Sequence, residues 1–289
     1  DIRLGDDTQL PNDIDLLVLS PGVSPLSPIV KAAQAAGVEI WGELELAWRL
    51  RDPAHLAPWL LVTGTNGKTT TTLMLESILL AAGKRTVAAG NIGRSLVEVV
   101  MDSTPWDVLA IEVGAPQLPF VHSISPQAAV CLNLAQDHID LFGTFEAYRD
   151  AKAKVYERCQ VAAIFNVADA ETIRMVEEAE VIEGCRAIGF STGIPDISML
   201  GVVEEFLVDR AFLENRREAA LELAEITDLA IPAVHNIANA LAASALARAY
   251  GIEARAIRDG LRSWQPAPHR IAHVGHVAGV DYNYDSKAT

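Results

Sequence analysis

One short stretch of the chain has the residue types needed to hold a phosphate group. It follows the apolar run Trp59–Val62 and reads Thr63-Gly64-Thr65-Asn66-Gly67-Lys68-Thr69-Thr70. Glycines allow the backbone to approach an anion, and the N-terminus of a following helix directs N–H groups toward it. In nucleotide-binding loops a lysine reaches the outer phosphates, and the Ser or Thr after it holds Mg²⁺. Lys68 and Thr69 have the types and the spacing for these two tasks.

The loop is shorter than the common phosphate-binding motif, because Val62 stands six positions before Lys68, where that motif has glycine. A Gly-Lys-Thr turn before a helix also occurs without any ligand. Here an apolar strand pattern precedes the turn, and a helical pattern follows it from Thr72 to Leu80. This succession favours a nucleotide loop that consists of Gly64, Thr65, Asn66, Gly67, Lys68, Thr69 and Thr70.

Other polar side chains stand at the ends of predicted strands. Glu112 ends one of them, and a carboxylate beside a nucleotide-binding strand commonly supports Mg²⁺. Asp137, His138 and Asp140 follow the next strand, and two carboxylates around an imidazole can bind metal or phosphate. In both places a solvated polar residue without a ligand is the alternative.

Two further turns carry polar residues with more than one interpretation. Ser20-Pro21-Gly22 follows a predicted strand and lies where ligands contact open parallel sheets, although an ordinary strand-to-helix turn explains it equally well. Asn236 precedes the helical run Ala238–Tyr250 and is either a ligand contact or a helix N-cap. Both alternatives stay open at the level of the sequence.

Strands and helices alternate along most of the chain. Before the nucleotide loop the pattern predicts strands at residues 15–20 and 38–41, helices at residues 28–36 and 43–51, and a linker at residues 52–55. Short strands that alternate with helices of this length indicate βαβ units, and hence an α/β fold around a parallel sheet. Residues Ile271 to Tyr284 differ, because they alternate like two short strands joined near Gly279.

The composition restricts the class of protein. The chain has 289 residues, 50% of them hydrophobic, which is enough for one large or two ordinary domains. A formal net charge of −15 leaves no broad basic surface for nucleic acid. No apolar run is long enough to span a membrane, so we expect a soluble, cytoplasmic monomer. Buried, reduced thiols are expected at the three widely spaced cysteines, Cys131, Cys159 and Cys185.

Together these motifs resemble those of the Mur ligases, a family of ATP-dependent ligases. The stretch Thr63–Thr70 is similar to the ATP loop of the family. Four further motifs fall in the family's order and approximate spacing, namely Asp137-His138-Ile139-Asp140, Tyr148-Arg149-Asp150-Ala151-Lys152, His235-Asn236 with Asn239, and His269-Arg270. The resemblance extends over nearly the whole chain.

The resemblance implies three domains, of which this chain holds a part. Residues 1–50 would be the back half of an N-terminal Rossmann-like domain for a UDP-sugar, residues 51–267 the central ATP-binding domain, and residues 268–289 the start of a Rossmann-like domain for the amino acid. The chain begins without an initiator methionine and stops within a polar segment, so we expect a fragment at both ends. Such a fragment should turn over negligibly by itself, because closure of the third domain normally completes the site.

The resemblance also implies roles for single residues. The nucleotide would be held by Lys68 with the loop amides at the β- and γ-phosphates, Asn236 and Asn239 near adenine, Arg270 near the phosphates and Asp285 at the ribose. Two Mg²⁺ ions would be held, one by Thr69 with Glu112 and one by His138 with Lys152. The other substrates would meet Lys287 near the reacting groups, and Ser20, Gly22, Asn91 and His138 on the UDP-sugar side.

Lys152 needs a chemical modification for this role, since an ammonium group cannot ligate Mg²⁺. The family carbamylates this lysine with carbon dioxide, which turns it into an oxygen ligand of the kind that Mg²⁺ prefers. From its place on the predicted helix alone, Lys152 would be an ordinary surface lysine.

Within the family, two segments are most similar to the members that join D-glutamate to UDP-N-acetylmuramoyl-L-alanine, namely Ser20-Pro21-Gly22 and Asp285-Ser286-Lys287-Ala288-Thr289. The implied reaction uses ATP to form an acyl phosphate and belongs to peptidoglycan precursor synthesis. A related ligase with a different amino-acid acceptor is one alternative. A nucleotide-binding module that does not ligate is another, because Gly114-Ala115-Pro116 stands where the family usually has Ser-Ser-Phe.

Overall fold

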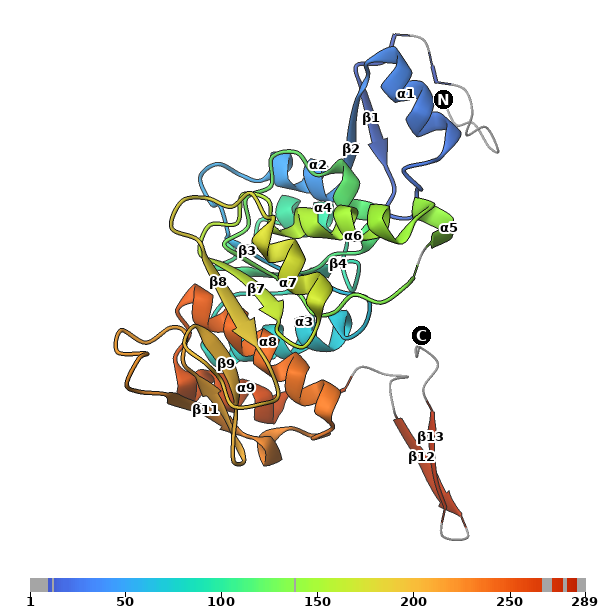
Figure 1. The fold of residues 1–289 in the computed structure, drawn as a ribbon. Helices are drawn as coiled ribbons and strands as arrows, with labels where there is room; N and C mark the ends of the chain where they lie inside the picture. The colour runs from blue at the N-terminus through green and yellow to red at the C-terminus, as the bar shows by residue number, and fades with distance from the viewer. Residues whose placement is uncertain (1–9, 12, 138, 267–271, 278–279, 285–289) are drawn as a thin grey trace.

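The computed structural model describes residues 10–11, 13–137, 139–266, 272–277 and 280–284. Its first unit is a small two-stranded parallel sheet with one helix, formed by β1 (Leu16–Leu19), α1 (Pro28–Ala36) and β2 (Glu39–Gly42). Proline in the first turn and Gly37 at the end, with a φ of +68°, give α1 the bounds that the sequence predicts. This unit stands at one end of the molecule (Figure 1).

A nine-stranded sheet forms the centre of the chain, in the order β11-β10-β9-β8-β7-β6-β3-β5-β4. The strands from β4 to β9 in this order are parallel, which confirms the predicted α/β class. At one edge of the sheet, β10 pairs antiparallel with both β9 and β11. The strands are β3 (Trp59–Thr63), β4 (Ala88–Gly90), β5 (Leu109–Glu112), β6 (Ala128–Cys131), β7 (Ala162–Asn166), β8 (Arg186–Phe190), β9 (Met199–Val203), β10 (Phe206–Asp209) and β11 (Leu221–Glu225).

Helices cover both faces of this sheet (Figure 1). One face is covered by α3 (Lys68–Ala81), α8 (Val234–Tyr250) and α9 (Ala254–Ser263). The other is covered by α2 (Glu43–Leu50), α4 (Leu96–Met101), α6 (Phe145–Ala153) and α7 (Ala170–Glu177). Alternate residues of β3 enter the two cores, with Leu60 and Val62 in the first and Trp59 and Leu61 in the second. Burial on both faces explains why β3 reads as a continuous apolar run.

Shorter elements connect these layers. They are α5 (Ile139–Phe142) and the 3₁₀ helices η1 (Ala115–Phe120), η2 (Lys154–Tyr156) and η3 (Ile226–Asp228). Thr144 caps α6 as its residue type suggests, since its Oγ1 accepts a hydrogen bond from the Ala147 N–H at 3.1 Å. The expected pair of strands near the C-terminus is also present as β12 (Ala272–Val277) and β13 (Val280–Tyr284), which pair antiparallel.

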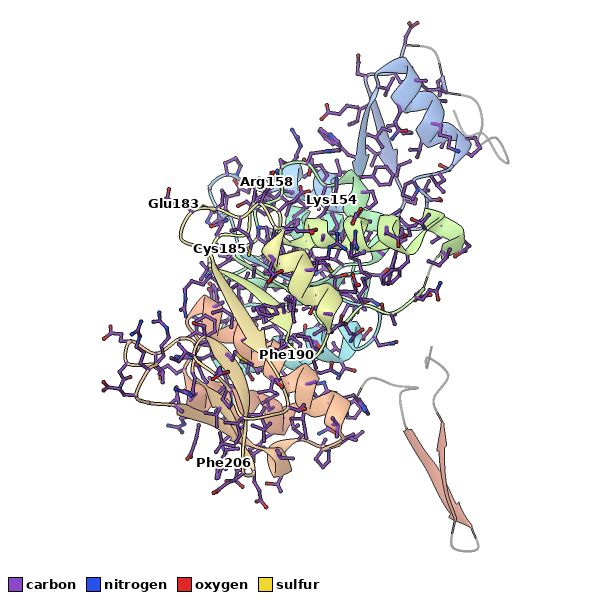
Figure 2. The ribbon with its side chains drawn as sticks, in the orientation of Figure 1. Lys154, Arg158, Glu183, Cys185, Phe190 and Phe206 are labelled. Carbon is purple, nitrogen blue, oxygen red and sulfur yellow. The ribbon has the colours of Figure 1, made fainter. Side chains whose placement is uncertain are left out.

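The cysteines largely follow the expectation of buried thiols. Cys131 and Cys159 are buried and free, whereas Cys185 is free but only partly buried, which corrects the expectation for that residue. Cys185 precedes β8 and the buried Phe190 ends it (Figure 2). No helix among the residues with described positions is long and apolar enough to cross a membrane.

The register of the sheet places the predicted polar residues at one edge. Val62 pairs with Glu112 of β5, and Thr63 pairs with Cys131 of β6. Because all three strands are parallel, their carboxyl ends meet, and the loops that follow them converge.

Candidate nucleotide and metal site

The loop after β3 has the backbone shape that its glycines predict. Gly67 has a φ of +86°, and a Cβ placed there would lie 2.5 Å from Asn239 Oδ1. Any other residue would therefore be strained and would clash with α8. The helix α3 begins directly afterwards at Lys68, four residues before the predicted start, so its first N–H groups follow the loop.

Lys68 lies across this loop. Its Nζ donates hydrogen bonds to the carbonyl oxygens of Gly64, at 3.0 Å, and Thr65, at 2.9 Å. These contacts hold the ammonium group beside the N-terminus of α3. A positive charge and a helix N-terminus at the same place form an anion-binding arrangement.

Thr69 and Glu112 meet beside the loop, although 43 positions separate them in the chain. Thr69 Oγ1 donates to Glu112 Oε2 at 2.8 Å, and Asn91 Nδ2 donates to Glu112 Oε1 at 3.0 Å. Glu112 is only 2% exposed. The structure thus brings three predicted site residues into direct contact, with a carboxylate at their centre.

The donor set fits a divalent cation that prefers oxygen. Thr69 and Glu112 offer a hydroxyl and a carboxylate, and Mg²⁺ usually takes one or two protein oxygens together with phosphate and water. Within the part of the chain that the structure describes, no group of three His, Cys, Asp or Glu side chains is placed to hold a metal by itself. A cation here would need oxygen atoms from a bound phosphate, which the adjacent loop is shaped to hold.

Lys152 is buried beneath the loop, with 1% of its surface exposed. Its Nζ donates to the Gly64 carbonyl at 2.9 Å and to Thr63 Oγ1 at 3.2 Å, and it lies 5.2 Å from the centre of the Tyr148 ring. Burial lowers the pKa of Lys152 to about 7. The surface position suggested by the helix pattern is therefore wrong, because packing turns this side chain under the loop.

Asn133 is a site residue that the sequence analysis missed. Its Oδ1 accepts from the Asn66 N–H at 2.8 Å, and its Nδ2 donates to the Asn66 carbonyl at 3.0 Å. The Thr65 N–H donates to the Asn133 carbonyl at 3.0 Å. The only signal in the sequence is a polar residue two positions after a buried strand.

Thr65 connects the loop to the helix that carries Lys152. Its Oγ1 lies 3.0 Å from the Tyr148 hydroxyl and accepts from the Ala135 N–H at 3.0 Å. Tyr148 is buried in α6 one turn before Lys152. The loop is therefore held from β6 and from α6.

The two asparagines of α8 are placed differently from one another. Asn239 is buried against Gly67, so it reaches the nucleotide loop. Asn236 is buried at the third helical position and donates from Nδ2 to the Ile231 carbonyl at 3.1 Å. The N-cap is Ala233, so the N-cap interpretation of Asn236 is wrong.

Other predicted residues are not brought into this group. Ser20 and Gly22 are exposed after β1, in the separate two-stranded unit, and Ser20 accepts a backbone hydrogen bond from Val23. Four further predicted site residues lie outside the described residues, namely His138, Arg270, Asp285 and Lys287.

Comparison with known protein families shows to which family the chain belongs. The family model of the Mur ligase middle domain matches residues 62–247, which include the loop, Glu112, Lys152 and Asn239. The chain belongs to the Mur ligase family. The similarity predicted from the motifs is therefore confirmed.

Relatives of this Mur ligase are identified over its whole length. It is 56% identical over 288 residues to the UDP-N-acetylmuramoylalanine--D-glutamate ligase of Streptomyces avermitilis, covering 100% of this chain and 62% of the relative. It is 48% identical over 290 residues to the ligase of the same name from Thermobifida fusca, again covering 100% of this chain and 62% of the relative. The chain thus spans less than two thirds of the length of these relatives.

Solved structures agree in fold. A crystal structure of MurF from Acinetobacter baumannii gives a TM-score of 0.60 at 20% identity, covering 94% of this chain and 64% of that one. The structure of Escherichia coli FolC in complex with DHPP and ADP gives a TM-score of 0.56 at 21% identity, covering 84% of this chain and 65% of that one. At these identities the likeness concerns the fold.

The segment Gly114-Ala115-Pro116, for which the resemblance implies Ser-Ser-Phe, follows β5. The Gly114 N–H donates to Gln117 Oε1 at 2.8 Å, and the 3₁₀ helix η1 begins at Ala115. Gln117 is buried, and its Nε2 has no hydrogen-bond partner among the residues that the structure describes. The backbone of this segment is thus ordered by the retained glutamine, without the two serine hydroxyls.

The two side-chain hydrogen bonds between Asn133 and Asn66 can be tested in this Mur ligase by the variant Asn133→Ala. We expect a loss of about 1 kcal/mol of unfolding free energy for each lost hydrogen bond, and a severalfold weaker affinity for nucleotide, because Asn66 is no longer held. Urea denaturation and calorimetric titration with ATP measure the two effects. The variant Asn215→Ala, at an exposed loop residue, is the control. Unchanged nucleotide affinity in Asn133→Ala would contradict a role in shaping the loop.

Proposed function

We propose that the protein is an ATP-dependent amide ligase that joins D-glutamate to UDP-N-acetylmuramoyl-L-alanine in peptidoglycan precursor synthesis. The observation that carries the proposal is the meeting of the Lys68 loop with the Thr69–Glu112 pair at one edge of the sheet. This arrangement suits a nucleotide with its divalent cation. The substrates are proposed from the names of the relatives that are 56% and 48% identical.

The proposed chemistry explains why such a reaction needs a nucleotide. A carboxylate is a poor acyl donor, so one of its oxygens attacks the γ-phosphorus of ATP, and ADP leaves. The amine of D-glutamate then attacks the carbonyl carbon of the acyl phosphate. Phosphate leaves from the tetrahedral intermediate, and the nitrogen loses its proton.

The residues of the chain would contribute position and charge to these steps. Lys68 and the N–H groups at the start of α3 would hold the outer phosphates and offset the negative charge that moves onto ADP. Mg²⁺, when bound at Thr69 and Glu112, would supply further neutralisation of phosphate charge. Asn239, beside Gly67, would border the nucleotide on the side of α8.

Carbamylation of Lys152 is part of this proposal. A buried amine with a pKa of about 7 is to a large extent neutral at physiological pH, and a neutral amine can attack carbon dioxide. The neutral amine forms a bond to the carbon of carbon dioxide and loses one proton, so a neutral group becomes a carbamate anion with two oxygen atoms. It would support a second Mg²⁺ together with His138.

The modification predicts a signal independent of catalysis. The protein equilibrated with ¹³C-bicarbonate should show one carbamate resonance that is absent from the variant Lys152→Gln, while Lys154→Gln should retain it. Lys154 is the matched control because it lies two residues away and its Nζ already contacts the Pro119 carbonyl, at 3.3 Å. A spectrum without a Lys152-dependent carbamate would overturn this part of the proposal and leave the nucleotide site unaffected.

The domain organisation remains part of the proposal. Residues 1–50 would belong to a UDP-sugar domain, residues 51–267 to the ATP-binding domain, and residues 268–289 to the start of an amino-acid domain. The separate sheet of β1 and β2 supports a distinct N-terminal unit, although α2, which ends at Leu50, packs on the central sheet. Ser20 and Gly22 would face the UDP-sugar from that unit, and Asn91 would face it from the nucleotide side.

An assay of the full-length protein tests the function. Phosphate should be released only when ATP, Mg²⁺, UDP-N-acetylmuramoyl-L-alanine and D-glutamate are all present. Release that requires another amino acid in place of D-glutamate would support the alternative of a different acceptor. Nucleotide binding without release under any of these conditions would support the alternative of a non-catalytic module, for which the altered Gly114-Ala115-Pro116 segment is the reason.

A further inference from the structure

A cavity of about 350 Å³ lies at the opposite edge of the sheet from the nucleotide loop. Trp59 and Leu109, the first residues of β3 and β5, form its floor, whereas the nucleotide loop follows the other end of β3. The length of the strand separates the two places by roughly 15 Å. Nothing in the proposed ligase chemistry uses this cavity. Its volume is in the range of small-molecule pockets.

The cavity contains a positive charge that pairs with no carboxylate among the described residues. Arg51 lines it just after the end of α2, and its guanidinium stacks on the Trp48 ring at 3.1 Å from the ring centre. Its Nε donates to the Trp48 carbonyl at 2.9 Å. Over the described part of the chain, no ion pair involves Arg51, and no hydrogen bond uses its two terminal nitrogens. Partial burial lowers the pKa of this group to about 10.

The acidic residues at the cavity are already engaged elsewhere. Asp102 accepts hydrogen bonds from the Thr104 N–H and hydroxyl and pairs with Arg94 at 2.9 Å. Asp52 accepts from the Ala54 N–H at 2.9 Å and lies 3.4 Å from His55 Nδ1. They leave the two terminal nitrogens of Arg51 available. Their charge also disfavours a ligand with two negative charges, such as a phosphate.

Part of the wall of the cavity and part of its surroundings are apolar. Trp59 and Trp106 line it, and the Trp59 indole nitrogen is buried without a hydrogen-bond partner in the described structure. Leu56 and Met101, which adjoin lining residues in sequence, are 54% and 68% exposed. A flat, apolar molecule would cover this surface, and a planar carboxylate would match the parallel N–H groups of a guanidinium.

We propose that this cavity binds a small molecule that combines a flat aromatic body with a single carboxylate, and that the carboxylate pairs with Arg51. The site is independent of the proposed ligase reaction. Arg51 follows α2 directly, and the segment 51–58 leads from the N-terminal unit into β3, so a bound molecule would lie against the connection between the two.

A matched pair of probes tests the proposal on the unmodified protein. Indole-3-acetate and indole-3-acetamide have the same shape, but only the first carries a charge. Titrations followed by the indole N–H resonances of ¹⁵N-labelled protein should give a Kd on the order of 1 mM for the acetate. The amide should bind roughly tenfold more weakly, because a charge-assisted pair becomes a neutral hydrogen bond. Equal affinities, or no binding of the acetate at about ten times that concentration, would overturn the proposal.

Variants then locate the binding. Arg51→Gln should reduce the affinity for indole-3-acetate to that for the amide, and Arg51→Lys should restore it only in part because the planar fork is lost. Arg174→Gln is the control, since Arg174 is exposed on α7 and pairs with Glu178. Saturation with ATP and Mg²⁺ should leave the titration unchanged. Displacement of the probe by ATP, or full binding by a folded Arg51→Gln variant, would contradict the assignment.

Discussion

Replacement of Lys68 by methionine is expected to reduce ATP-dependent phosphate release by roughly two to three orders of magnitude. The ammonium group is held beside the start of α3 by the carbonyl oxygens of Gly64 and Thr65, at 3.0 and 2.9 Å. In the proposed reaction it would therefore lie where charge accumulates on the outer phosphates. Methionine keeps the length and the apolar part of the side chain but removes the charge.

The Lys68→Met variant of the full-length protein should be measured for turnover with all substrates and for ATP affinity by calorimetry. Loss of the two hydrogen bonds to the Gly64 and Thr65 carbonyls should lower its unfolding free energy by about 2 kcal/mol. Lys84→Met is the matched control, since Lys84 follows the other end of α3 and lies near the Tyr250 ring. Wild-type turnover in Lys68→Met would exclude the assigned role of the loop.

Replacement of Lys152 by methionine is expected to change the pH dependence of stability. In the folded protein the pKa of Lys152 is about 7, whereas an unfolded lysine has a pKa of about 10.4. Between these values the unfolded chain binds more protons than the folded chain, so the free energy of unfolding rises with pH. Below a pH of about 7 both states are protonated, and the folded state carries the full cost of a buried charge.

The Lys152→Met variant has no such group, so its stability should change less between pH 7 and pH 10. Across this window the unfolding free energy of the parent should rise by a few kcal/mol more than that of the variant. Relative to the parent, the variant should therefore be stabilised most at the acidic end. Urea denaturation in buffers free of carbon dioxide measures it. The exposed Lys31→Met variant on α1 should keep the parental profile. If the unfolding free energies of Lys152→Met and the parent changed in parallel with pH, the lowered pKa of Lys152 would be contradicted.

The same substitution should lower the proposed ligase activity by roughly 10- to 100-fold, as is usual for groups that support a metal site. Stability at acidic pH and activity therefore move in opposite directions in one variant. A loss of activity caused by unfolding would move both in the same direction.

The sequence alone determined the features that depend on neighbouring residues. The nucleotide loop, the bounds of α1 and the alternation that indicates a parallel sheet follow from glycine positions and hydrophobic periodicity, which act over a few residues. The pairing of Thr69 with Glu112 was also accessible, since parallel strands bring their carboxyl ends to one edge.

Only the tertiary structure decided which side chains are buried, because burial depends on elements far away in the chain. Lys152 became a buried amine since α6 packs its side chain under a loop 88 residues earlier. Asn133 meets the nucleotide loop because β6 lies beside β3, and the Arg51 guanidinium stacks on the Trp48 ring. The local periodicity of a sequence does not predict contacts between residues this far apart in the chain. The charge and the accessibility of each group are therefore properties of the fold.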